Sequence, residues 1–145
     1  MGARAYLISS LLAAIWLGSM TAIGFFAVPT TFATLPELSM AGHLAARFFY
    51  GQGWISMVCI VLLVMFFRTS LRSAGDPATG KKPDMWYFGA LLLGFFLALF
   101  IQQVVQPRIL ARDNLALWHN LGTALYVLEW ACAVLAVLRL QLRKV

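Results

Sequence analysis

The sequence predicts an all-α integral membrane protein, a four-helix bundle with its N and C termini in the cytoplasm. Of the 145 residues, 62% are hydrophobic and 11% are charged, and the mean hydropathy is +0.85. Soluble domains contain about 45–50% apolar and about 25% charged residues. The apolar residues form four blocks, each near the roughly 20 residues that a helix needs to cross a bilayer. Helices are expected because a lone spanning strand would leave backbone groups unpaired in lipid.

The predicted spans cover residues 5–32, 44–67, 85–106 and 117–138, and residues 1–145 form a single membrane domain. The first apolar block follows Arg4 and is much longer than the roughly 7–15 residue core of a cleaved signal peptide. It is therefore expected to remain as a signal anchor. Between the second and third spans, residues 68–84 contain Gly-Asp-Pro and Gly-Lys-Lys-Pro, which predict an exposed loop.

The distribution of basic residues predicts the orientation. Three of the eleven Lys and Arg residues fall on the side opposite the N-terminus, namely Arg47, Arg108 and Arg112, and the other eight fall on the N-terminal side. Cytoplasmic loops carry the excess of basic residues, so both termini and the 68–84 loop are expected in the cytoplasm. The formal charge of +6 is thus explained by topology and by contact with the lipid bilayer, and no nucleic-acid partner is expected.

Small residues in the first span predict close helix packing. Ser10, Ala14, Gly18 and Ala22 recur at four-residue spacing, which allows a neighbouring helix backbone to approach. Gly24 is grouped with these packing residues, and Pro29 is expected to kink or end the helix.

The two helical hairpins also show a faint internal similarity. Gly24-Phe25-Phe26 and Gly94-Phe95-Phe96 each precede a proline and a histidine, as a parallel repeat would. Cys59 and Cys132 have neither CxxC nor zinc-like spacing and are interpreted as buried core residues.

Polar residues gather at the outer ends of the spans. His43 and Arg47 share one helical face, and Gln102 and Gln106 share another. The candidate ligand-binding residues are His43, Arg47, Gln102, Gln106, His119, Asn120 and, deeper, Glu129. These faces could converge on an outward-opening pocket for a small polar ligand or ion. The simpler alternative is that such residues reach headgroups or water at the membrane interface.

Glu129 lies ten residues beyond His119 in the last apolar block, or about 15 Å deeper. A carboxyl group at this depth should face the bundle, either protonated or paired with hydroxyl groups such as those of Ser19, Thr21 or Ser56. A structural hydrogen bond is the simpler role, and a proton or cation relay is the alternative.

Several rival functions remain open. His43 and His119 could ligate haem b in an oxidoreductase, and Met20 or Met57 with Cys59 could bind Cu(I). The sequence contains no Walker motif, dinucleotide fingerprint, HExxH or GxSxG, so a non-enzymatic role is favoured. A structural subunit, as a homodimer or with a larger membrane-protein partner, is the third possibility.

Several motifs also carry a family resemblance. They are Trp16-Leu17-Gly18-Ser19, Gly24-Phe25 with Ala27, Pro29 and Phe32, Ala41-Gly42 with Arg47-Phe48-Phe49, Gln106-Pro107-Arg108, Leu117-Trp118-His119 and Leu128-Glu129. Together they resemble a bacterial four-helix membrane family of unknown function that is similar to eukaryotic transmembrane protein 205. The resemblance implies a multi-pass protein of the bacterial inner membrane, and the platinum-drug resistance associated with the eukaryotic relative suggests metal or drug handling. Haem-dependent protoporphyrinogen oxidases and copper-resistance membrane proteins are similar in size.

Overall fold

The computed structural model describes residues 3–74 and 84–142, and every regular element in these ranges is helical. The first hairpin contains α1 (Ala3–Ala22), the π-helical segment η1 (Ile23–Ala27), α2 (Val28–Thr34) and α3 (Leu38–Ala74). The second contains α4 (Met85–Phe100), the π-helical segment η3 (Ile101–Val105), α5 (Gln106–Leu110) and α6 (Leu115–Leu142).

Among the described residues, four long apolar helical segments could each cross a membrane, which confirms the prediction of an all-helical protein with four membrane-capable helices. They cover Ala3–Thr34, Leu38–Arg68, Met85–Leu110 and Leu115–Leu142. The sequence assigns 68–84 to a loop, whereas α3 continues as a helix to Ala74 and residues 75–83 lie outside the described residues.

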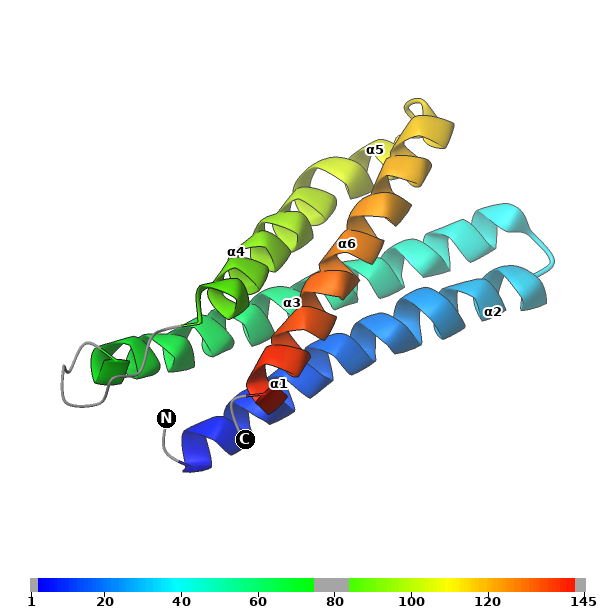
Figure 1. Ribbon diagram of the computed structural model, residues 1–145. Coiled ribbons are helices and arrows are strands. Elements are labelled where there is room, and N and C mark those ends of the chain that lie inside the picture. The colour runs from blue at the N-terminus through cyan, green and yellow to red at the C-terminus, as the bar shows by residue number, and fades with distance from the viewer. Residues whose placement is uncertain (1–2, 75–83, 143–145) are drawn as a thin grey trace.

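The helices run alternately up and down (Figure 1). Helix α1 packs against α3 and α6, and α4 packs against the same two helices, so the four form a closed ring around one core. The start of α1 and the end of α6 lie together, where the Tyr6 hydroxyl donates to Gln141 Oε1 at 3.2 Å. We call this the terminus end, and we call the opposite end, with the connections at residues 35–37 and 111–114, the turn end.

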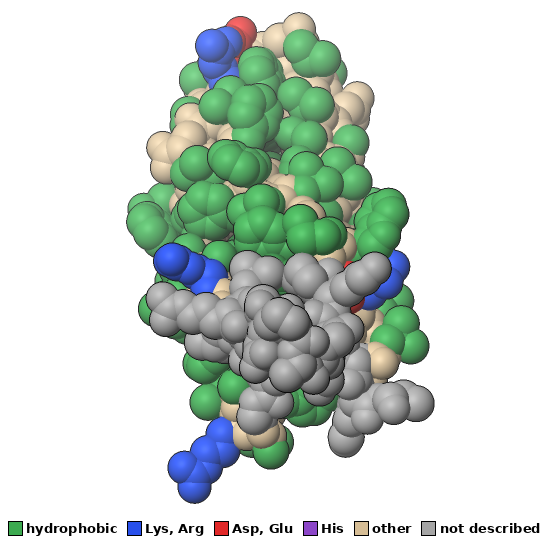
Figure 2. All heavy atoms as spheres, turned by 60° about the vertical axis from the view of Figure 1, so that its left-hand side comes forward, with side chains coloured by type: hydrophobic (Ala, Val, Ile, Leu, Met, Phe, Trp, Pro, Cys, Tyr) green, Lys and Arg blue, Asp and Glu red, His purple; other side chains and the backbone are tan. Residues whose placement is uncertain are grey.

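The interior and exterior are both largely apolar. The most deeply buried large side chains include Trp16, Met20, Leu63, Leu91 and Leu140, which come from all four helices. Outside, Phe26, Leu38 and Trp86 are among many exposed large hydrophobic residues, and Figure 2 shows hydrophobic side chains over most of the visible described surface. An exterior this apolar indicates contact with the lipid bilayer.

Two π-helical segments precede prolines at the same spacing. Segment η1 ends two residues before Pro29, and η3 ends two residues before Pro107. Proline lacks a backbone N–H and crowds the carbonyl four residues earlier, so a wider turn just before it relieves that conflict. The hairpins therefore match in their π segment and proline. The Gly-Phe-Phe motifs do not match, since Gly24 lies in η1 and Gly94 lies within α4.

Candidate functional site

A groove opens at the turn end between α3 and α5. It has a volume of about 300 Å³ and is lined by His43, Ala46, Arg47, Tyr50, Gln106 and Leu110. We call it the turn-end groove. A second groove of about 340 Å³ lies on the other side of His43 and Arg47, and its remaining lining is apolar: Leu35, Met40 and Leu44. His43 and Arg47, one helical turn apart on α3, thus border both grooves.

The polar side chains of the turn-end groove can act as hydrogen-bond donors. Arg47 carries only donors, and the amide nitrogen Nε2 of Gln106 is buried with no hydrogen-bond partner. Within the described ranges, no hydrogen bond or ion pair engages the side chain of His43 or Arg47. Such a groove can accept a ligand that offers hydrogen-bond acceptors or a negative charge.

Gln102 lies on η3, one helical turn deeper in the bundle than Gln106. Its side chain is 6% exposed, and its Nε2 donates to the backbone carbonyl of Tyr50 at 3.3 Å. Its amide oxygen lies directly against Gly53, where any Cβ would collide with it, and this oxygen has no hydrogen-bond partner. The absence of a side chain at Gly53 therefore makes room for the Gln102 amide.

Glu129 lies near the middle of α6 and is 3% exposed. The indole Nε1 of Trp16 donates to Glu129 Oε1 through a long hydrogen bond of 3.5 Å, and the Ser56 hydroxyl is also a hydrogen-bond partner of the carboxyl group. Ser56 in turn accepts from Gln52 Nε2 at 3.2 Å. The amide oxygen of Gln52 is buried without a partner.

These residues form a buried series that we call the polar row: Gln102, Gln52, Ser56, Glu129 and Trp16. Gln102 and Gln52 both lie at the Tyr50–Gly53 level of α3, Ser56 is one turn further along, and Glu129 is at the level of Ser56. Gln106, one turn before Gln102, lines the turn-end groove. The row thus extends from beneath the groove to the centre of the bundle.

The three proposed hydroxyl partners of Glu129 have different roles. Ser19 donates to the Trp16 carbonyl at 3.1 Å. Thr21 donates to the Leu17 carbonyl at 2.8 Å and accepts from Trp130 Nε1 at 2.9 Å. Ser56 is the partner that interacts with Glu129.

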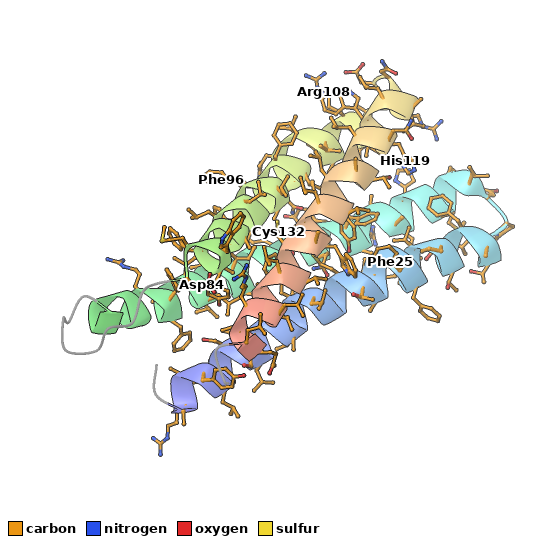
Figure 3. The ribbon with its side chains drawn as sticks, viewed as in Figure 1. Phe25, Asp84, Phe96, Arg108, His119 and Cys132 are labelled. Atoms are coloured by element: carbon orange, nitrogen blue, oxygen red, sulfur yellow. The ribbon has the colours of Figure 1, made fainter. Side chains whose placement is uncertain are left out.

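His119 and Asn120 do not share this arrangement. Both are exposed on α6 near the turn end, and neither lines the two grooves; Figure 3 labels His119 there. The predicted ligand residues therefore divide into three that line the groove (His43, Arg47 and Gln106), two in the polar row (Gln102 and Glu129) and two outside both.

Metal-binding side chains do not cluster among residues 3–68 and 84–142. No group of three or more His, Cys, Asp or Glu residues in this part of the chain could hold a metal ion. Cys59 and Cys132 are free and buried in the apolar core, as the sequence predicts.

Of the residues predicted to pack helices, one lies in a close helix contact and most of the others are exposed. Gly24 lies against the ring of Tyr126, where a Cβ would collide. Ala14, Gly18 and Ala22 are exposed, as is Pro29, and no atom lies within 4 Å of where a Cβ on Gly18 would be. These three members of the small-residue stripe therefore face outward, whereas Ser10 is half-buried, and the role of the stripe in packing stays a prediction.

The sequence interpretation missed Gln52, the residue that continues the polar row from Gln102 to Ser56. A signal was present: Gln52 and Ser56 are four residues apart within an apolar span, and Gln52 lies between Gly51 and Gly53. A buried glutamine in a membrane helix faces the bundle because lipid offers no hydrogen-bond partner. Trp16 stands out in the sequence only as part of a motif, yet it is the donor to Glu129.

Comparisons with known proteins place the chain in a family. Neither the curated proteins nor the solved structures gave a match. Residues 11–117 match the family described as "Domain of unknown function (DUF4149)", a stretch that includes most of the first membrane-capable helix, all of the second and third, and the groove. The chain is therefore a member of the DUF4149 family.

Proposed function

We propose that this chain is a non-enzymatic, multi-pass protein of the bacterial inner membrane that binds a small polar ligand through the turn-end groove. The observation that carries the proposal is that Gln106, whose buried Nε2 has no hydrogen-bond partner, lines the same groove as Arg47 and His43. A buried donor without a partner costs about 1–3 kcal/mol, which a ligand acceptor would offset. Because the groove also holds a guanidinium group, the ligand class is an anion or a molecule with an anionic group.

The proposal also includes the side of the membrane that the groove faces and the kind of ligand that it binds. Cytoplasmic termini would place the groove on the outer side of the membrane, since the groove lies at the turn end. The resemblance to transmembrane protein 205 suggests a role in metal or drug handling. His119 and Asn120 lie at the same end and would contact a ligand larger than the groove.

The test uses phosphate and acetate as probes with the protein purified in mild detergent. Each salt is compared with chloride at equal ionic strength, and the melting temperature is measured. A bound anion stabilises the folded state by mass action, so the melting temperature should rise with phosphate or acetate and Arg47→Ala should remove the rise.

Arg108→Ala is the matched control, because Arg108 lies at the same end but pairs with Asp113 at 2.8 Å outside the groove. An equal rise in wild type and Arg47→Ala would overturn the groove assignment. A visible absorption spectrum of the same sample tests the haem rival: a Soret band lost in His43→Ala or His119→Ala would replace ligand binding with redox chemistry.

A further inference from the structure

The polar row has more hydrogen-bond acceptors than donors. The amide nitrogen of Gln52 is used by Ser56, that of Gln102 by the Tyr50 carbonyl, and the Trp16 indole by Glu129. Two amide oxygens remain without partners, those of Gln52 and Gln102, on residues only 2% and 6% exposed. Buried polar atoms of this kind call for an occupant such as water or an ion.

The charge of the polar row indicates which kind of ion would bind there. Glu129 is the only carboxylate among the buried described residues, and no buried Lys or Arg faces it there. An ionised carboxylate in a membrane interior is costly, so Glu129 is expected to hold either a proton or a cation. A single positive charge would balance the site, whereas a divalent ion would leave a net charge in an apolar core.

The chemical nature of the possible ligand atoms indicates which type of cation would bind. Carboxylate, hydroxyl and amide oxygens are hard ligands, which bind alkali and alkaline-earth ions in preference to copper or other soft metals. The two thiols lie nearer the terminus end than the proposed ligands. Cys59 follows Ser56 by three residues, and Cys132 follows Glu129 by three residues. The side chains that we consider as cation ligands therefore all offer oxygen atoms.

We propose that the oxygens of Gln52, Ser56, Gln102 and Glu129 bind a monovalent alkali cation in the centre of the bundle. The inference rests on the proposed function in treating the row as the inner end of the polar path that begins at the turn-end groove. It adds a second ligand class: donors in the groove take an anion, and acceptors in the row take a cation.

Gly53 provides a sharp variant for the test. A Cβ there would collide with the Gln102 amide, so Gly53→Ala displaces one proposed ligand oxygen without removing a polar group. Gly51→Ala is the matched control on the same helix, because nothing lies within 4 Å of a Cβ at Gly51. Gln52→Leu removes a second oxygen and keeps the side chain near its original size.

The experiment follows modification of Glu129 by dicyclohexylcarbodiimide, a hydrophobic reagent that attacks carboxylic acids in apolar surroundings. Purified protein is labelled at one pH in sodium, lithium, potassium or choline chloride at equal ionic strength, and the adduct is quantified by mass spectrometry. A bound alkali cation should slow labelling about fourfold at about three times its dissociation constant, where about three quarters of the molecules are occupied. Gly53→Ala and Gln52→Leu should lose this protection, and Gly51→Ala should keep it.

The melting temperature of the same samples gives a second readout that does not depend on labelling. An alkali cation should raise it relative to choline in wild type and in Arg47→Ala, but not in Glu129→Gln. If neither labelling nor melting temperature of wild type responds to any alkali cation, the row holds only water and the inference is wrong. A cation response with no phosphate or acetate response would instead reject only the groove proposal.

Discussion

The hydroxyl of Tyr126 on α6 donates to the backbone carbonyl of Met20 on α1 at 2.9 Å. The same ring lies over Gly24 in η1 and meets Phe49 edge to face, with ring centroids 5.2 Å apart. Tyr126 thus links three helices beside the first π segment. Because lipid does not drive helices together through the hydrophobic effect, such close packing and interhelical hydrogen bonds carry the association.

Replacing Tyr126 with Phe should lower the stability of the bundle. The substitution keeps the ring over Gly24 but leaves the Met20 carbonyl without its side-chain donor. Interhelical hydrogen bonds in membranes contribute about 0.6 kcal/mol on average and up to about 1.7 kcal/mol, so a loss in this range is expected. Thermal unfolding in detergent measures it. Tyr50→Phe is the control, since the exposed Tyr50 side chain makes no hydrogen bond with another described residue; an equal loss there would contradict the assignment.

Glycines at helix contacts should tolerate alanine poorly. A Cβ at Gly94 would lie 2.7 Å from the Trp16 ring, which is fully buried, and one at Gly24 would collide with the Tyr126 ring. Overpacking of this kind costs about 1–3 kcal/mol. Gly18→Ala and Gly89→Ala are the controls because nothing lies within 4 Å there, and alanine favours a helix by about 0.5–1 kcal/mol. Thermal unfolding should therefore separate the two pairs, and equal effects would show that Gly24 and Gly94 do not limit packing.

The stability of the bundle should fall more when the Glu129 side chain is truncated than when it loses only its charge. Glu129→Gln keeps an oxygen for Trp16 and nearly the same volume. Glu129→Ala leaves the Trp16 indole and the Ser56 hydroxyl without that acceptor, and each unsatisfied buried group costs about 1–3 kcal/mol. We expect a clear fall in melting temperature for alanine and a small change for glutamine, both measured in choline chloride. A larger loss for glutamine would show that ionic pairing, rather than hydrogen bonding, stabilises the site.

The parts of the fold that depend on composition were predictable. Span length and hydropathy predict four helices, and the cost of an unpaired carboxyl in lipid predicts that Glu129 faces the bundle, as its 3% exposure shows. Ser56 was one of three hydroxyl partners predicted from depth alone, because spacing along separate helices does not give their relative rotation.

The rotation of each helix about its own axis also explains where the structure differs from the sequence predictions. Ala14, Gly18 and Ala22 have packing spacing but are exposed, whereas Ala13, Trp16 and Met20 of the same helix are buried. Large hydrophobic residues occur on both the exposed and the buried sides of all four spans, so hydrophobic periodicity does not distinguish the lipid face from the core face. The π segments shift the register again, and Gln102 lies within one of them. Its contact with Gly53 therefore depends on a local widening that the sequence does not indicate.

The orientation in the membrane is a prediction that decides which side the groove faces. Reporters fused after Arg72 and after Val145 should read cytoplasmic, and one fused after Asn114 should read as translocated. The reason is the distribution of charge: eight of the eleven basic residues fall on the side of the N-terminus, and basic residues are retained on the cytoplasmic side. A phosphatase and a fluorescent protein report opposite sides, so each position has an internal control. If the reporter after Asn114 reads cytoplasmic while the other two read as translocated, the groove faces the cytoplasm and its ligand must be sought there.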